Sequence, residues 1–334
     1  MTLEEFLNEW HNESDKVLVH TSGSTGSPKP ILAEKRRMEA SARITCKFLG
    51  LKAGDTALLC MPLDYIAGKM MVVRAEVCRL RLISVPPSGH PLANLECAPT
   101  FAAMVPMQVY NSLSVPAERR LLNKIQHLII GGGAIDNALE KELRTIEANV
   151  WSTYGMTETL SHIALRRVNG PEASEWYTPF DNVTVSLSDE GCLIINAPEV
   201  CSNVLTTNDI AEINEDRRKF RIIGRKDNVI CSGGIKIQAE EVERKLAPHI
   251  NAPFIITKRK DPKYGETVVM LIESDEIPKT EEICRNILPK YWQPHIIVSV
   301  NHIPMTQTGK PARKEAENIA AKITEQEMPI AGLR

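Results

Sequence analysis

The sequence predicts an α/β protein with three parts: a large N-terminal α/β domain with a parallel sheet, a small β-rich subdomain, and a small C-terminal α+β domain. Apolar runs alternate with helical patterns from residue 56 to residue 145, which is typical of a parallel sheet covered by helices. From Thr184 the pattern changes to short strands and turn signals such as Asp-Glu-Gly at 189–191. The 334 residues suffice for two or more domains.

The N-terminal elements follow from capping residues and periodicity. Thr2 and Glu5 have the spacing of a capping box, and apolar residues recur behind them at helical intervals, so we expect a short amphipathic helix. A strand follows from Val17, and residues 35–49 are predicted as a helix that ends at Gly50. Alternating apolar runs and helical segments are then expected at 56–61, 70–79, 82–85, 100–105, 128–130 and 137–145.

The C-terminal part begins after a boundary that we place at 224–227. Residues 1–223 then form the N-terminal domain and residues 228–334 the C-terminal domain. Within the latter, the sequence predicts helices at 239–246 and 280–288, strands at 254–258 and 267–273, and a terminal loop and helix.

The composition is that of an ordinary soluble protein, with 43% hydrophobic and 25% charged residues. A net charge of −2 gives no reason to expect a nucleic-acid or anionic-membrane partner. No apolar run is long enough to span a bilayer, and the acidic start with Glu4, Glu5 and Glu9 is unlike a signal peptide. The eight cysteines form no Cys-x-x-Cys pair, so we expect reduced thiols in the cytoplasm.

The segment from Thr21 to Lys29 carries five hydroxyls, two glycines and one lysine behind an apolar strand. Glycine lets the backbone approach an anion, and hydroxyls, N–H groups and a lysine bind it, so this loop is suited to phosphate. It is not the common P-loop, because Pro28 precedes the lysine and Pro30 follows it. A flexible Ser/Gly turn is the alternative that composition alone leaves open.

The ordered string Thr-Ser-Gly-Ser-Thr-Gly-x-Pro-Lys resembles the phosphate loop of the adenylate-forming superfamily, which includes acyl-CoA and aryl-CoA synthetases. Segments 154–158, 206–209, 224–243 and 304–310 resemble later motifs of that superfamily, in its order. The resemblance implies the adenylate-forming fold with a mobile C-terminal domain. Only sixteen residues precede Val17, so it also implies a shortened N-terminal domain, closed without the usual segment or covered by a partner chain.

The resemblance implies a two-step ligase that uses ATP, Mg²⁺ and CoA. A carboxylate attacks the α-phosphorus of ATP and releases pyrophosphate, and CoA then takes the acyl group and releases AMP. The first step needs donors around the phosphates and a mobile cation, because charge spreads over the phosphate oxygens. Mg²⁺ prefers carboxylate and phosphate oxygens, and Glu158 is the implied ligand.

The resemblance implies a role for each residue that matches a motif position of the superfamily. The implied catalytic residues are Lys310, Thr157 and Glu158. The implied ATP- and AMP-binding residues are Thr21, Ser22, Gly23, Ser24, Thr25, Gly26, Lys29, Gly131, Gly132, Gly133, Tyr154, Gly155, Asp209 and Arg225. Asp227 matches the hinge residue, and the implied CoA channel residues are Ser232, Gly233 and Gly234. Outside their motifs such residues are more often surface charges or turns, so these roles depend on the order of the motifs.

Several stretches resemble the o-succinylbenzoate–CoA ligases of menaquinone biosynthesis: 61–63, 68–74, 99–108 and 154–162. Their substrate carries a second carboxylate, which an apolar pocket must neutralise because an unpaired buried charge costs several kcal/mol. The implied acid-binding residues are Arg74, Lys69, Ser161 and His162. Asp64 and Tyr65 replace the Phe-His pair of the superfamily, which is a departure beside this pocket.

Three functions remain open at this point. The chain is an o-succinylbenzoate–CoA ligase, a ligase for another aryl or acyl acid that loads CoA or a carrier protein, or a relative without activity. The presence of Lys29, Glu158, Asp209, Arg225 and Lys310 argues against the last of these. The expected partners are small molecules, and the sequence leaves a homo-oligomer open.

Overall fold

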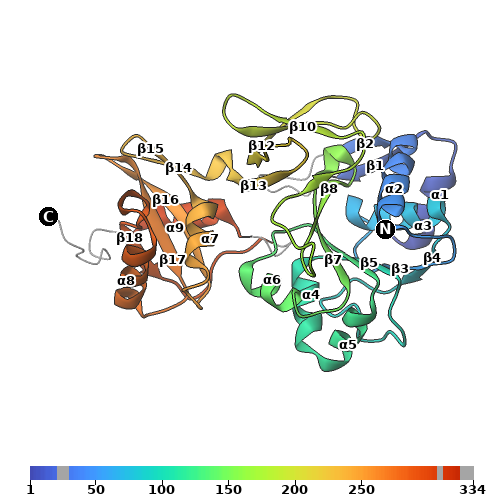
Figure 1. Cartoon of the computed structure of the whole chain (residues 1–334), viewed down its shortest axis with the longest axis horizontal. Coiled ribbons are helices and arrows are strands. Elements are labelled where there is room, and N and C mark those ends of the chain that lie inside the picture. Colours follow the sequence, from blue (N-terminus) through green and yellow to red (C-terminus); the bar gives the residue numbers. More distant parts are fainter. Residues whose placement is uncertain (21–29, 307–310, 324–334) are drawn as a thin grey trace. The chain divides into compact units, whose positions relative to one another are not determined.

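The structure is a computed structural model that describes residues 1–20, 30–306 and 311–323 (Figure 1). Contacts within the chain define two units. The first comprises Met1–Ser186, Ile194–Thr206 and Ile213–Arg221, and the second comprises Leu187–Leu193, Thr207–Glu212 and Ile222–Arg334. The hinge at 224–227 stays a prediction.

A seven-stranded sheet in the order β4-β3-β5-β6-β7-β8-β9 forms the centre of the first unit. Strands β4, β3, β5, β6 and β7 run parallel, whereas β8 and β9 are antiparallel to their neighbours. The strands are β3 (Thr56–Leu59), β4 (Arg81–Ser84), β5 (Phe101–Met104), β6 (His127–Ile130), β7 (Asn149–Gly155), β8 (His162–Arg167) and β9 (Thr178–Pro179). The predicted parallel sheet is therefore confirmed.

Helices cover both faces of this sheet (Figure 1). The helices are α1 (Leu3–His11), α2 (Lys35–Leu49), α3 (Ile66–Cys78), α4 (Pro106–Ser114), α5 (Pro116–Lys124) and α6 (Asn137–Leu143). Along β3, Ala57 and Leu59 belong to the core cluster with α1, α2 and α3, while Leu58 between them belongs to the cluster with α4, α5 and α6. Successive side chains of a strand point to opposite faces, so the sheet is buried on both sides.

Local signals explain which helix bounds were predicted correctly. Glu5 N–H donates to Thr2 Oγ1 over 3.1 Å and Thr2 N–H donates to the Glu5 carboxylate over 2.7 Å, which confirms the capping box of α1. Helix α2 ends before Gly50, which has a φ of 67°. Helix α3 starts at Ile66 rather than Met70, because residues 68–75 are buried on all sides and leave no amphipathic pattern.

Two smaller sheets contain the strand predicted from Val17 and the short strands predicted from Thr184; strand β2 was not predicted. Strands β1 (Lys16–His20) and β2 (Pro30–Glu34) form an antiparallel pair in the first unit. The short strands expected from Thr184 onward are confirmed as a four-stranded sheet in the order β10-β11-β12-β13. Its members are β10 (Thr184–Leu187), β11 (Cys192–Asn196), β12 (Leu205–Ile213) and β13 (Phe220–Arg225).

The long C-terminal segment of the second unit is an α+β body, as predicted. Its sheet has the order β15-β14-β17-β16, and β18 pairs with β17 in parallel. The elements are β14 (Val229–Ser232), β15 (Ile235–Gln238), α7 (Ala239–Leu246), β16 (Phe254–Asp261), β17 (Gly265–Ile272), α8 (Ile277–Ile287), β18 (Ile296–Ser299) and α9 (Arg313–Lys322). Short 3₁₀ turns lie at η1 (Thr157–Thr159), η2 (Lys226–Asn228) and η3 (Lys290–Trp292). In the described ranges, no helix has the length and apolarity needed to cross a membrane.

Candidate functional site

Eight of the expected site residues lie outside the described residues. They are Thr21, Ser22, Gly23, Ser24, Thr25, Gly26, Lys29 and Lys310. The described residues still define the two ends of segment 21–29, because His20 at the end of β1 pairs with Pro30 at the start of β2. The expected phosphate-binding segment therefore connects two adjacent antiparallel strands.

The glycines at 131–133 follow β6 at the carboxyl edge of the parallel sheet. Gly131 N–H donates to Met104 O over 3.1 Å, and a Cβ on Gly131 would overlap Thr153 Oγ1. Gly132 has a φ of 77°, which side-chain-bearing residues rarely adopt. Ligands of open α/β sheets bind outside the carboxyl ends of the strands, so this backbone lies where a flat group is expected to bind.

The segment 154–158 lies beside these glycines, because β6 and β7 are paired and both end at this edge. Gly155 leaves no room for a Cβ, which would overlap Ser161 O and His162 Cα. The tight passage brings the chain into η1, where Thr157 is buried and Glu158 is exposed. Tyr154 packs edge-on against Phe220, with ring centroids 5.1 Å apart.

The carboxylate of Glu158 is exposed, as a magnesium ligand needs to be. No group of three or more His, Cys, Asp or Glu side chains within the described part of the chain is placed to hold a metal. Mg²⁺ is commonly bound by one or two carboxylates together with substrate phosphates and water. The arrangement therefore suits a magnesium ion that arrives with a nucleotide rather than one held by the protein alone.

Arg74 on α3 is a buried charged residue of the first unit, only 2% exposed, as are Lys69 and Glu118. Its Nη2 donates to Ser161 Oγ over 2.6 Å, and Nη1 lies 3.8 Å from Met71 Sδ. Its Nε is buried without a hydrogen-bond partner, and no described carboxylate forms an ion pair with it. Burial lowers the pKa of Arg74 to about 10, so the guanidinium is still charged at neutral pH.

A chain of hydrogen bonds runs from Arg74 through the next strand to α2. Ser161 Oγ lies 3.2 Å from His162 Nδ1, and His162 Nε2 lies 3.1 Å from Thr45 Oγ1. Thr45 donates its own hydroxyl proton to Ser41 O over 3.1 Å, so it accepts from His162 Nε2–H. Burial and the charge of Arg74 hold the pKa of His162 well below its usual value, which makes the imidazole neutral.

Lys69 does not join this cluster, although it lies on the same helix. Its Nζ lies 3.3 Å from Glu9 Oε2, donates to Leu18 O over 2.9 Å, and lies 5.0 Å from the Phe6 ring centroid. The structure thus brings Arg74, Ser161 and His162 together and places Lys69 against a carboxylate of α1. Of the two basic residues proposed for the acid, only Arg74 has an uncompensated charge.

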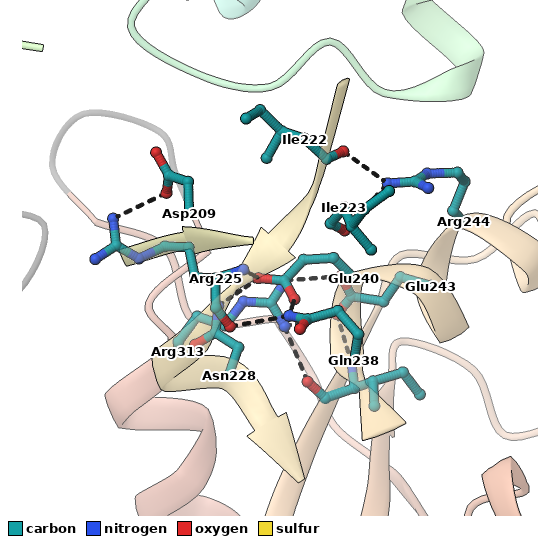
Figure 2. A network of polar contacts seen from close by, with 11 residues as sticks. Asp209, Ile222, Ile223, Arg225, Asn228, Gln238, Glu240, Glu243, Arg244 and Arg313 are labelled. Carbon is teal, nitrogen blue, oxygen red and sulfur yellow. Dashed lines mark hydrogen bonds and ion pairs between the residues drawn. The ribbon is translucent and has the colours of Figure 1, made fainter. Parts of the chain in front are cut away.

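The expected ribose and hinge residues are neighbours in the second unit. Arg225 Nη1 lies 3.6 Å from Asp209 Oδ1 (Figure 2). Arg225 Nη2 donates to Asp227 Oδ2 over 3.0 Å. Asn208, which replaces the usual glycine, lies within strand β12 and donates to Asp227 Oδ2 over 3.4 Å. A carboxylate and a guanidinium are thus presented side by side, as recognition of vicinal hydroxyls requires.

The expected CoA-channel residues form the turn between β14 and β15. Gly233 and Gly234 have φ values of 57° and 82°, so both need the conformational freedom of glycine. Ser232 is buried at the end of β14, and Gly233 N–H donates to Tyr264 O over 2.9 Å. Nothing in these contacts tests CoA binding, and the role stays a prediction.

The sequence motifs do not include residues that act through contacts distant in sequence. Thr45 completes the Arg74 hydrogen-bond chain, and Arg313 pairs with Glu243 beside the expected hinge (Figure 2). The sequence contained one signal for the second pair: Arg313 follows Lys310 closely, and Glu243 ends the acidic run of α7. No local signal marked Thr45.

Comparisons with known proteins agree with the order of the motifs. A family model described as AMP-binding enzyme matches residues 7–197. The 2-succinylbenzoate–CoA ligase of Enterococcus faecalis is 27% identical over 93% of this chain and 70% of that ligase. The crystal structure of an acyl-CoA synthetase (AMP-forming)/AMP-acid ligase II-like protein from Dyadobacter fermentans matches with 35% identity and a TM-score of 0.65. This match covers 95% of this chain and 92% of that protein.

A second solved structure supports the fold. The o-succinylbenzoate coenzyme A synthetase of Bacillus subtilis, solved in complex with ATP and magnesium ion, has a TM-score of 0.72. It is 21% identical and covers 89% of this chain and 69% of its own. At this identity the likeness shows the adenylate-forming fold.

Proposed function

Because this chain belongs to the AMP-binding enzyme family, we propose that it is an ATP-dependent carboxylate–CoA ligase whose acid is o-succinylbenzoate. The family membership and the relatives support an AMP-forming ligase of the acyl-CoA synthetase type. The narrower assignment places the enzyme in menaquinone biosynthesis, in the cytoplasm, with ATP, CoA and the acid as its small-molecule partners.

The buried and uncompensated charge of Arg74 carries the substrate assignment. A charged group this deep is stable only with a partner, and the described part of the chain offers a hydroxyl but no carboxylate. A substrate with a second carboxylate would supply that partner. Ser161 would add a hydrogen bond, and neutral His162 would hold Ser161 in place without adding a second charge.

The first step forms the acyl-adenylate. A carboxylate oxygen of the acid attacks the α-phosphorus of ATP, the bond to the bridging oxygen breaks, and pyrophosphate leaves. We propose that the 21–29 segment binds the β- and γ-phosphates, that Thr157 contacts the α-phosphate, and that Lys310 bridges the carboxylate and the α-phosphate as charge builds. Glu158 would hold magnesium together with phosphate oxygens, and the ion would neutralise part of that charge.

The nucleoside contacts come from two places. We propose that Gly131, Gly132 and Gly133 pass beside the adenine at the carboxyl edge of the sheet, together with Tyr154 and Gly155. Asp209 would accept from the ribose hydroxyls and Arg225 would donate to them, because the two side chains already lie 3.6 Å apart. Their partial exposure leaves room for a ligand.

The second step forms the thioester. The CoA sulfur attacks the acyl carbon of the adenylate, the carbon–oxygen bond to AMP breaks, and the thiol proton is lost. We propose that the C-terminal domain rotates about Asp227, which withdraws Lys310 and brings Ser232, Gly233 and Gly234 to the thiol channel. One site then serves both reactions while water is excluded from the adenylate.

A panel of acids tests this proposal. We expect pyrophosphate exchange into ATP that depends on o-succinylbenzoate and Mg²⁺ but not on CoA, and thioester formation when CoA is added. A carrier protein in place of CoA serves as the second acceptor in the panel. Exchange with an unrelated acid alone would discard the substrate assignment and leave the reaction class, whereas no exchange with any acid would contradict the ligase.

A hinge at Asp227 predicts a variant whose defect is confined to thioester formation. Asp227→Pro fixes φ and restricts Lys226, so adenylate should form and accumulate while thioester formation slows. Asp227→Ala is the matched control, since it removes the contacts to Arg225 and Asn208 but leaves the backbone free. Single-turnover measurements of both half-reactions check this. Normal turnover in Asp227→Pro would place the hinge elsewhere.

A further inference from the structure

A half-buried ion pair lies in the second unit, next to the expected hinge (Figure 2). Arg313 Nη1 and Nη2 donate to the two carboxylate oxygens of Glu243 over 2.8 and 2.7 Å, a bidentate geometry. Arg313 Nη1 also donates to Ile256 O over 3.0 Å, and Ile256 N–H donates to Glu243 Oε1 over 2.8 Å. The pair is therefore fixed to strand β16 at both ends.

Arg313 lies directly after the segment that contains Lys310. Arg313 is the first residue of α9 and follows Lys310 by two intervening residues. Before it, Ala312 N–H donates to Pro304 O over 2.8 Å, and Met305 and Pro311 form an isolated antiparallel bridge. The described residues on both sides of segment 307–310 are thus paired with each other, and Arg313 anchors the exit.

Glu240 connects the same pair to the expected hinge. Glu240 and Glu243 lie three positions apart on α7 and so share one face of the helix. The Glu240 carboxylate accepts from Asn228 Nδ2 and from Gln238 Nε2, and it lies 3.4 Å from Arg225 N and 4.0 Å from Arg313 Nη2. A continuous set of polar contacts therefore runs from Arg225 to Arg313 (Figure 2).

The charges of the pair agree with its geometry. Burial alone would lower the pKa of Arg313, but the adjacent Glu243 outweighs this and raises it above its ordinary value. Burial raises the pKa of Glu243, and Arg313 opposes that rise. We take the carboxylate as ionised, because two guanidinium N–H groups and one backbone N–H donate to it.

We infer that Glu243 and Arg313 are positioning residues for adenylation: they fix the chain immediately after Lys310, and Glu240 links this anchor to the hinge residues 225–228. The inference rests on the proposed function, because it assigns Lys310 to the first half-reaction. Loss of the anchor should then impair adenylation more than thioester formation. A pair that only stabilised the C-terminal body would affect both half-reactions alike.

Two variants test the inference. Arg313→Lys keeps the charge but loses the bidentate contact, and Glu243→Gln keeps the shape and loses the charge. A small displacement of a reacting group costs about 10²-fold in rate, so we expect adenylation to fall about 10- to 100-fold in both variants. Thioester formation from preformed acyl-adenylate should change by no more than about threefold, because a displaced Lys310 would slow only the first half-reaction. Arg313→Lys remains informative if Glu243→Gln does not fold.

The matched control is Glu317→Gln, which removes an exposed ion pair from the same helix. Glu317 Oε2 lies 3.1 Å from Lys314 Nζ on the surface of α9. Exposed pairs of this kind contribute little to stability, so we expect both half-reactions and the Tm of this variant to match the wild type.

A measurement without substrate separates this inference from the proposed function. Amide hydrogen exchange at Ala312, which is bonded to Pro304 O, should accelerate in Arg313→Lys and stay unchanged in Glu317→Gln. Unchanged exchange at Ala312, or equal losses in both half-reactions, would overturn the positioning role. A wild type that activates no acid, with accelerated exchange in Arg313→Lys, would contradict the proposed function and leave the anchor standing.

Discussion

Lys310→Ala is expected to abolish most acyl-adenylate formation while CoA still reacts with preformed acyl-adenylate at nearly the wild-type rate. The lysine is proposed to contact charge that develops only in the first transition state. Removal of one such contact costs about 10²–10³ in rate. Because we propose that the side chain withdraws before the second step, its removal should leave that step unaffected.

The two half-reactions are measured separately, by pyrophosphate exchange and by single-turnover thioester formation from synthetic acyl-adenylate. Lys314→Ala is the matched control, since Lys314 lies close in sequence and is 79% exposed on α9. We expect this control to behave as the wild type in both assays. Equal losses in the two half-reactions of Lys310→Ala would show that one conformation serves both steps.

Arg74→Ala should raise the KM for o-succinylbenzoate steeply while the KM for ATP stays nearly unchanged. Removal of the guanidinium would leave the ring carboxylate buried without a partner, which costs roughly 2–5 kcal/mol, or about 30- to 4,000-fold in affinity. Lys69→Met is the matched control, because it removes a buried positive charge from the same helix that already has a carboxylate partner. We expect Lys69→Met to lower stability without a selective effect on the acid.

Most of the fold followed from local signals. Helix α7 was predicted at its observed bounds because its apolar residues lie on one face and its charged residues on the other. Helix α2 was predicted at its observed bounds because Gly50 ends it. Helices α4 and α5 were not predicted. Each is only nine residues long, so its periodic pattern is short.

Only those residues of the candidate site that stand within a sequence motif could be predicted. The motif order selected Glu158, Asp209 and the glycines, since each stands within a recognisable string. It could not distinguish Lys69 from Arg74, because both are basic residues in one apolar segment. Which of them has a partner depends on Glu9 and Ser161, residues far from α3 in the sequence.

The same limit applies to the polar networks. His162 meets Thr45 across 117 positions, and Arg313 meets Glu243 across 70. The first pairing leaves no periodic or compositional trace, and the acidic run of α7 does not identify Arg313 as the partner of Glu243. The packing of whole elements brings these side chains together. The structure was needed to show that Arg74 and Arg313, both arginines in helices, differ in that only Arg313 has a carboxylate partner among the described residues.

We propose that Arg74 pairs with a second carboxylate of the substrate, and a thermodynamic cycle of binding measures this pairing. The Kd values of o-succinylbenzoate and of an analogue without the ring carboxylate are measured by calorimetry with wild type and Arg74→Ala. Arg74→Ala changes the binding free energy of each acid, and the difference between these two changes is the coupling free energy between the arginine and the ring carboxylate. We expect Arg74→Ala to weaken o-succinylbenzoate by roughly 2–5 kcal/mol and the analogue hardly at all. Equal weakening of both acids would mean that Arg74 supports the fold and does not recognise the substrate.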